Sequence, residues 1–339
     1  MIASPETLEV DSKPGSGPKI RSALPMERVQ SNQTAGDAVD ETLYLLGRPT
    51  LKQLVRFVKS HAVNPADAGA LNEEWQAAHR QIETLQKLEA GFADNPRMTP
   101  LTELGKDYEE LLLDLLKSPL LQNHFNTVPT DIALVELDRL VVYQKHIDLT
   151  FVETLKRQLG PMPDEAAIFD ACLPFNPPQP PVKWSRVHRD TFVFMSPSND
   201  LRFLETMRLE PNHIANYPPP GSVVGVIGLA VGFGTNFLNA IYAEGRLILN
   251  NGSHRAYALR DLGVTHVPCI VQHVSSREEL DLVASDEVRE HPDLYLKQAR
   301  PSVLKDYFDP KLRKIVPVHR RMRQITVKFQ IDEAYVPAF

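Results

Sequence analysis

Cysteine is scarce in this chain of 339 residues: only Cys172 and Cys269 occur, and neither has a neighbour at metal-ligand spacing. A disulfide framework is therefore not indicated, and a reducing cytoplasm is the simplest setting for two unpaired thiols. No group of His, Asp and Glu shows a recognised zinc or iron spacing, so we expect no metal centre held by the protein alone.

Long apolar runs are also missing. None approaches the ~18 residues that a membrane-spanning helix needs, and the first residues lack the basic-then-apolar pattern of a secretory signal. We therefore expect a cytoplasmic protein without membrane contact. The longest apolar-looking stretch, residues 223–233, is interrupted by glycine and is interpreted as buried strands and turns.

An excess of basic charge is absent as well: 37 Lys and Arg against 43 Asp and Glu give a net charge of −6 at pH 7. This balance argues against a protein coated for nucleic acid. The segment 297–328 is an exception, with ten Lys and Arg against two Asp. Such a segment can bind nucleic acid, or it can dock on acidic parts of the same chain or of a protein partner. Because its only aromatic residues are Tyr307 and Phe308, we expect docking or a simply solvated surface rather than nucleic-acid binding.

The spacing of apolar residues predicts an α+β fold in four parts. Before residue 125, leucines recur at spacings of three and four, which is typical of helices. From residue 128 on, runs rich in Val and Ile indicate strands, and a last alternating run at 325–331 indicates a half-buried strand. The predicted parts are a disordered tail (1–35), a helical bundle or cap (36–125), a mixed-sheet core (126–275, with an insertion at about 161–240) and a basic helix–strand extension (276–339).

The most informative tract is residues 247–259, where a short apolar run stops at Asn-Asn-Gly and Ser-His-Arg opens a stretch with helical spacing. A strand that turns sharply into a helix leaves several N–H groups without intrahelical partners, and with the helix dipole they form an anion site. Arg255 adds a forked cation, and His254 adds a group that titrates near neutrality. The tract therefore predicts phosphate recognition. The alternative is a capped helix in which Ser253 satisfies backbone donors and Arg255 pairs with a carboxylate.

The run 231–236, Val-Gly-Phe-Gly-Thr-Asn, is a candidate second wall of the same ligand site. Thr235 and Asn236 would supply its hydrogen-bonding groups. The run lacks the third glycine of a dinucleotide fingerprint and the Gly-Lys-Ser/Thr of a P-loop. Its alternative interpretation is a buried turn that requires small residues.

A second local signal is Asp148 or Thr150, either of which can cap a helix that ends at Gly160.

Two segments together resemble the ParB/sulfiredoxin superfamily. The run Val-Glu-Leu-Asp-Arg-Leu-Val-Val-Tyr-Gln-Lys-His at 135–146, followed by a helix, is similar to the opening strand and helix of that family. The tract Asn-Gly-Ser-His-Arg at 251–255, its helix, and the Val-Pro strand at 263–271 are similar to the family's phosphate-binding element and closing strand. The match covers about residues 128–275 and leaves the two ends of the chain unexplained.

The resemblance implies a nucleotide or phosphate site in the tract: Asn251, Gly252, Ser253, His254 and Arg255. The family's repair enzyme carries a cysteine where this chain has Ser253, so sulfur chemistry is not expected here. Its serine kinases carry an acidic residue where this chain has Asn251. The catalytic acid of those kinases is not placed by the motif, and by neighbourhood alone the candidates are Glu136, Asp138 and Asp148.

Two functional hypotheses follow. The first is a nucleotide-dependent enzyme, in its specific form a phosphotransferase that acts on a small hydroxyl compound, with ATP, ADP or CTP as nucleotide and Mg²⁺ as its companion. In it, Gly252 and Ser253 supply backbone donors and Arg255 clamps the phosphate. His254 donates a hydrogen bond or shuttles a proton, and a carboxylate from residues 136–148 activates the acceptor. The alternative is a non-catalytic nucleotide- or nucleic-acid-binding switch, which contacts a protein partner through the helical region or the basic tail.

Overall fold

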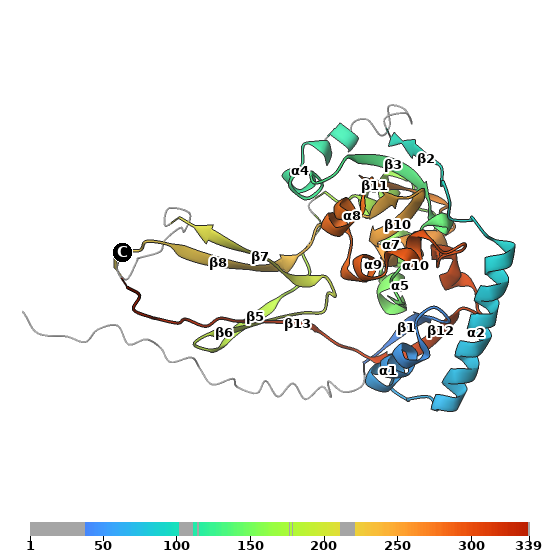
Figure 1. Cartoon of the computed structure of the whole chain (residues 1–339), viewed down its shortest axis with the longest axis horizontal. Helices are drawn as coiled ribbons and strands as arrows, with labels where there is room; N and C mark the ends of the chain where they lie inside the picture. The colour runs from blue at the N-terminus through green and yellow to red at the C-terminus, as the bar shows by residue number, and fades with distance from the viewer. Residues whose placement is uncertain are drawn as a thin grey trace, which may run out of the picture. The chain divides into compact units, whose positions relative to one another are not determined.

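The computed structural model describes residues 38–101, 111–113, 115–175, 177, 179–210 and 221–337, and the tail predicted for residues 1–35 lies outside them. The described residues form the predicted α+β fold, in which helices and several small sheets alternate along the chain (Figure 1). None of the described helices is both long and apolar enough to cross a membrane. From residue 38 on, the described residues cluster into one compact unit.

A five-stranded sheet with the order β10-β9-β11-β3-β2 holds most of the core. Strands β9 and β11 run parallel, and the other neighbours run antiparallel. Most residues of β9, β10 and β11 are buried, as expected for strands that are covered on both faces. The strands are β2 (Met98–Pro100), β3 (Thr130–Glu136), β9 (Asn239–Ala243), β10 (Arg246–Asn251) and β11 (His266–Val274).

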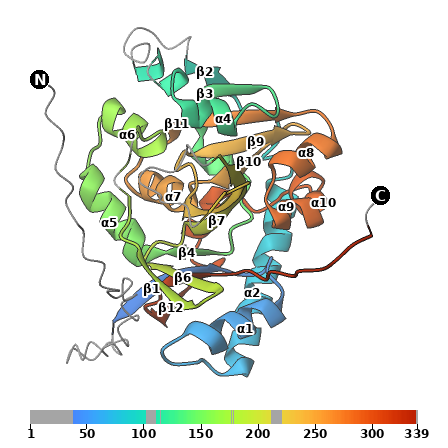
Figure 2. The ribbon, with the colours of Figure 1, turned by 90° about the vertical axis from the view of Figure 1, so that its left-hand side faces the viewer.

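Three helices pack together beside this sheet, and one of them, α7, connects β10 to β11 (Figure 2). They are α5 (Leu149–Leu159), α6 (Glu165–Cys172) and α7 (Ser253–Asp261). The cap of α5 is Asp148 rather than Thr150, because the Asp148 carboxylate accepts the Phe151 N–H at 2.9 Å. Gly160, with φ 76°, ends α5 as predicted.

The start of the expected helical bundle is a strand. β1 (Val39–Leu45) lies between β12 (Arg313–His319) and β4 (His146–Asp148). Residues 43–46 are all buried, because a central strand buries both faces. Its sequence therefore lacks the alternation of polar and apolar residues that would have indicated a strand. Helices follow only after it: α1 (Leu51–His61), α2 (Ala68–Leu88) and α4 (Pro119–His124), while residues 102–110 of a further expected helix lie outside the described residues.

The basic segment 297–328 docks on acidic residues of the same chain. Arg300, 2% exposed, and Lys305 pair with Glu89 at 3.0 and 2.9 Å, and Arg300 also pairs with Asp306 of the same segment at 2.5 Å. Two further ion pairs, both at 2.7 Å, are Lys314–Glu74 and Arg320–Asp40. Three short helices precede this segment in the chain, and a fourth lies within it: α8 (Arg277–Val283), α9 (Asp286–Glu290), α10 (Pro292–Leu296) and η4 (Leu304–Phe308).

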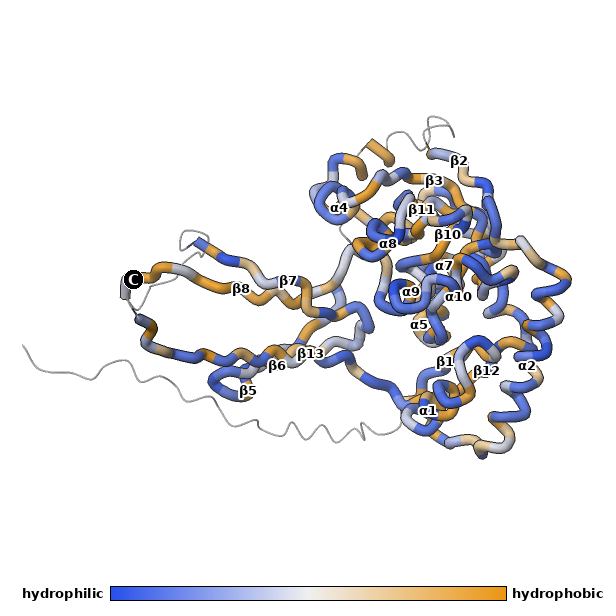
Figure 3. The backbone as a smooth tube through the Cα atoms, in the orientation of Figure 1, coloured by the Kyte–Doolittle hydropathy of each residue, from blue (hydrophilic) through white to orange (hydrophobic). Residues whose placement is uncertain are grey.

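The expected insertion contributes most of two further sheets. The hairpin of β5 (Lys183–His188) and β6 (Thr191–Ser196) is joined by β13 (Arg323–Lys328), whose residues alternate between exposed and half-buried as predicted. β7 (Leu201–Leu209) pairs with β8 (Val226–Phe233) in a two-stranded ribbon. The prediction that residues 223–233 are buried is wrong. Val224 is 93% exposed and Ile227 is 75% exposed, and Figure 3 shows the apolar character of β8.

Candidate functional site

The junction between β10 and α7 is a sharp strand-to-helix turn. Gly252 precedes α7 with φ 98°, in the left-handed region that favours glycine. A Cβ atom at this position would lie 3.1 Å from Leu238 Cγ and 3.2 Å from Leu238 Cα. Glycine is therefore required for packing as well as for backbone conformation. The helix begins at Ser253, and the first N–H groups of such a helix have no intrahelical acceptor.

Arg255 binds the protein's own backbone. Its side chain is 8% exposed, and Nη1 donates to the carbonyls of Ala171 at 2.9 Å and Asn236 at 2.5 Å, with a longer contact to Cys172 at 3.4 Å. Burial lowers the pKa of Arg255 below its usual value. Because Ala171 and Cys172 lie at the end of α6, the guanidinium joins α7 to the negative end of that helix. The predicted phosphate clamp is thus a structural clamp, and Asn236 contributes its carbonyl to it.

His254 also makes its contacts inside the protein. Its Nε2 accepts the backbone N–H of Asp148 at 3.0 Å, and its ring meets Phe151 edge-on at 5.6 Å. Burial, with smaller contributions from the nearby His146 and Arg255, lowers the pKa of His254 to about 4. The expectation that His254 titrates near neutrality is therefore wrong, because the neutral ring is needed as an acceptor.

The three candidate carboxylates serve different elements. Asp148 caps α5, and burial raises its pKa above the usual value. Asp138 pairs with Arg260 of α7 at 2.9 Å. Glu136 ends β3 opposite His266 of β11. The structure brings Asp148 next to His254 through a backbone N–H, and it gives Asp138 and Glu136 other neighbours.

A cavity of about 450 Å³, which we call the carboxamide pocket, opens at the end of β10. Of the predicted site residues, Asn251 and Thr235 line it, whereas Gly252, Ser253, His254, Arg255 and Asn236 do not. Its volume lies in the range of small-molecule sites. None of the described residues that line it carries a carboxylate. Its hydrogen-bonding side chains include four carboxamides and several hydroxyl groups: Asn239, Asn250, Asn251, Gln272, Tyr143, Thr235 and Ser285.

Two asparagines form the floor of the carboxamide pocket. Asn239 of β9 and Asn251 of β10 are cross-strand partners, and both donate from Nδ2 to the carbonyl of Phe237, at 3.2 and 3.0 Å. Asn251 Nδ2 also lies 3.1 Å from the carbonyl of Thr235. Asn239 is only 4% exposed, and its Oδ1 has no hydrogen-bond partner among the described residues. A buried acceptor without a donor costs stability, so we expect a bound water or a ligand to donate to this atom.

Arg202 connects the carboxamide pocket to the β7–β8 ribbon. It is the second residue of β7, it lines the pocket, and it pairs with Asp200. A Cβ atom at Gly234, just after β8, would lie 2.8 Å from the Arg202 guanidinium carbon. The glycine of the Val-Gly-Phe-Gly run therefore makes room for Arg202 beside the pocket. Of the two residues predicted for the second wall, Thr235 lines the pocket and Asn236 does not.

Sequence reasoning missed most of the pocket. Asn239 and Gln272 are each 4% exposed in largely apolar strands, and an amide within such a strand is the signal that could have identified them. Within the part of the chain that the structure describes, no three His, Cys, Asp or Glu side chains gather so that they could hold a metal ion. Comparisons with protein-family profiles, with curated proteins and with solved structures give no match. The similarity to the ParB/sulfiredoxin superfamily therefore stays a prediction.

Proposed function

We propose that this chain binds a nucleotide in the carboxamide pocket and acts as a nucleotide-dependent switch. The observation that carries the proposal is the unpartnered Oδ1 of Asn239, which is buried in the floor of a 450 Å³ cavity lined by amide and hydroxyl groups. A carboxamide offers one donor and one acceptor side by side, which matches the hydrogen-bonding edge of a nucleobase.

The other lining residues suit the remaining parts of a nucleotide. Phe125 and Tyr143 supply aromatic rings, and Arg202 supplies a guanidinium for phosphate. The resemblance of the 251–255 tract to a phosphate-binding element supports the same ligand class, because Asn251 belongs to both the tract and the pocket. ATP, ADP and CTP remain the proposed nucleotides. Mg²⁺ would arrive as the companion of the phosphates, since the pocket offers neutral oxygens.

The switch follows from the position of Arg202. A ligand phosphate would compete with Asp200 for the Arg202 guanidinium, and Arg202 belongs to β7. Nucleotide occupancy would then change the conformational freedom of the β7–β8 ribbon, which exposes apolar residues suited to a partner. Hydrogen exchange of residues 201–209 and 226–233, with and without nucleotide, measures this coupling. We expect slower exchange with nucleotide, and identical exchange would contradict the switch.

A phosphotransferase is the second candidate, and one observation favours it. His124 lines the pocket, and its Nδ1 lies 2.9 Å from the carbonyl of Leu120. The Nδ1 nitrogen must donate to this carbonyl, so Nε2 of the neutral ring carries the lone pair and is available as a base. Chromatographic analysis of nucleotide incubated with small hydroxyl compounds tests this candidate. Product that forms with the wild type and not with His124→Ala would favour the enzyme over the switch.

Calorimetric titration with ATP, ADP, CTP and GTP in the presence of Mg²⁺ tests the binding site itself. Asn239→Leu keeps the branching and the number of side-chain heavy atoms and removes the unpartnered oxygen, while Phe237 O keeps its bond from Asn251. We expect an affinity at least about tenfold lower, from the loss of a ligand hydrogen bond, with little change in the free energy of unfolding. Glu136→Gln is the matched control and should bind as the wild type does. Unchanged affinity of Asn239→Leu, or the absence of any nucleotide binding, would refute the proposal.

A further inference from the structure

The three-stranded sheet β5-β6-β13 gathers aromatic rings on one face. Directly paired residues of neighbouring strands lie on the same face of a sheet. Trp184 pairs with Phe194, and Arg186 pairs with Phe192. Phe329, which follows β13, stacks on Phe192 with ring centroids 6.4 Å apart. The rings come from segments more than 130 residues apart in the sequence, so no single segment shows the pattern.

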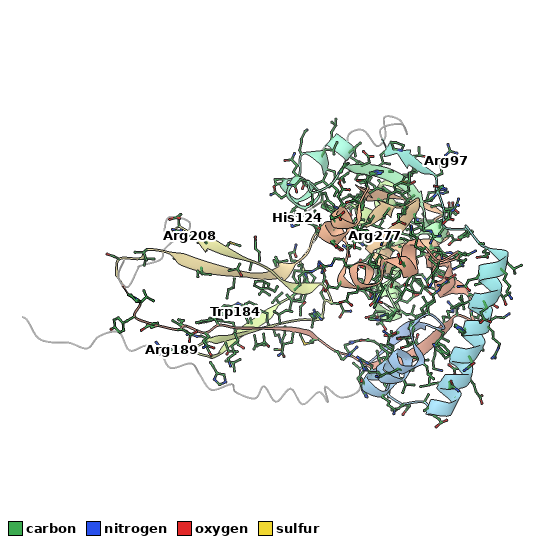
Figure 4. The ribbon with its side chains drawn as sticks, in the orientation of Figure 1. Arg97, His124, Trp184, Arg189, Arg208 and Arg277 are labelled. Atoms are coloured by element: carbon green, nitrogen blue, oxygen red, sulfur yellow. The ribbon has the colours of Figure 1, made fainter. Side chains whose placement is uncertain are left out.

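The rings on this face are accessible. Trp184 is 65% exposed and Phe329 is 36% exposed, and Figure 4 shows Trp184 on the three-stranded sheet. Trp184 stacks on Phe194 at 6.2 Å with an interplanar angle of 24°. Every residue of the edge strand β5 is exposed. Large exposed rings at regular positions on a sheet indicate a binding surface.

The charge of this sheet is opposite to that of the whole chain. Its three strands contain four cations and no Asp or Glu, whereas the chain carries a net charge of −6. The Arg186 guanidinium lies 5.5 Å from the centroid of the Phe192 ring, which is a cation–π contact. Arg186 and Arg323 lie on the face of the rings, because they pair with Phe192 and Ser196, whereas Lys183 and Lys328 pair with Met195 and Thr191 and lie on the opposite face.

We propose that this face, with Trp184, Phe192, Phe194 and Phe329 as rings and with Arg186 and Arg323 as cations, binds single-stranded nucleic acid. Bases would stack on the rings, and phosphates would contact the cations. Successive rings on one strand face are two residues apart, or about 6.8 Å. This is about twice the ~3.4 Å rise per nucleotide of a duplex, so neighbouring bases must separate, which a single strand allows.

The positive charge of the sheet also favours nucleic acid over a second copy of the chain as the binding partner. Two identical cationic sheets would repel each other when they meet face to face. The proposed surface is separate from the carboxamide pocket, because none of its residues lines that cavity. An experiment that refutes one of the two sites therefore does not refute the other.

Fluorescence anisotropy with labelled 20-nucleotide dT and rU strands, and with a duplex of the same length, tests the proposal on the full chain. We expect both single strands to bind more tightly than the duplex, and the comparison of dT with rU shows which sugar is preferred. Trp184→Ala should weaken binding about tenfold or more, because base stacking on such a ring is lost. Trp184→Phe keeps a ring and should retain most of the affinity.

Salt dependence gives a second readout. The slope of log K against log salt is about −0.7 for each phosphate contact, so the two cations on this face give about −1.4. Arg186→Gln should reduce this slope by about 0.7. Phe175→Ala and Arg97→Gln are matched controls outside the sheet, where Phe175 is 57% exposed, and both should bind as the wild type does.

Three results would overturn the proposal. The first is equal affinity of the wild type and Trp184→Ala for the single strands. The second is preference for the duplex. The third is a concentration-dependent dimer that Trp184→Ala abolishes while the strands do not bind, because this would make a second copy the occupant.

Discussion

Replacing Arg255 with alanine distinguishes the structural role of this residue from the phosphate-binding role that its sequence tract predicts. The buried guanidinium donates to the carbonyls of Ala171 and Asn236 at 2.9 and 2.5 Å. The variant leaves two carbonyls without their donor and opens a cavity at a side chain that is 8% exposed. Hydrogen bonds from a charged donor contribute about 1.5–3 kcal/mol each. Partial relaxation of the site reduces the sum, and we expect a loss of about 3 kcal/mol in the free energy of unfolding.

Urea unfolding followed by circular dichroism measures this loss. At about 2 °C per kcal/mol for a domain of this size, the melting temperature should fall by about 6 °C. Arg202→Ala is the matched control, because its ion pair with Asp200 is half-exposed and its loss should cost less than about 1 kcal/mol. We expect nucleotide affinity to fall in Arg202→Ala. If Arg255→Ala keeps full stability and abolishes nucleotide binding, the structural role of Arg255 is wrong.

Two further predictions concern the same turn. The pKa of His254 is about 4 in the folded protein against an ordinary 6.5, so the unfolded chain binds this proton first and stability falls as pH drops from 6.5 to 4. The loss of stability should reach up to about 3 kcal/mol. His254→Gln keeps an acceptor but does not titrate, so its free energy of unfolding, measured in urea titrations, should depend less on pH. An unchanged pH dependence in this variant would contradict the buried neutral ring. Gly252→Ala should cost about 2–3 kcal/mol and Gly263→Ala about 1 kcal/mol, because both glycines have positive φ but only the first would meet Leu238. Equal losses in urea unfolding would show that the Leu238 contact is unimportant.

Local features of the fold were predictable because their causes lie within a few residues. The cap at Asp148, the stop at Gly160 and the alternation of β13 each follow from side chains close in sequence. The sharp turn at Gly252 belongs to the same class. Strand β1 was not predictable, because its partner β12 lies about 270 residues further along the chain and its burial on both faces removes the alternation.

The candidate site shows the same division. The sequence indicates a polar turn after β10, and it identifies Asn251 and Thr235. It does not show that Arg255 meets carbonyls 19 and 84 residues away. The pairing of Asn239 with Asn251 depends on the register of β9 and β10, and the pocket exists only once that register is set.

Photo-crosslinking tests the central claim most directly. The nucleotide with the highest affinity is prepared as its azido-base analogue, bound with Mg²⁺ and irradiated, and the labelled peptide is identified by mass spectrometry. The carboxamide pocket predicts labelling at or beside Phe125, Tyr143 or Asn239, with competition by the unmodified nucleotide. Two results would contradict the claim. One is labelling that the unmodified nucleotide reduces but that occurs only outside the pocket lining. The other is labelling that the unmodified nucleotide does not reduce.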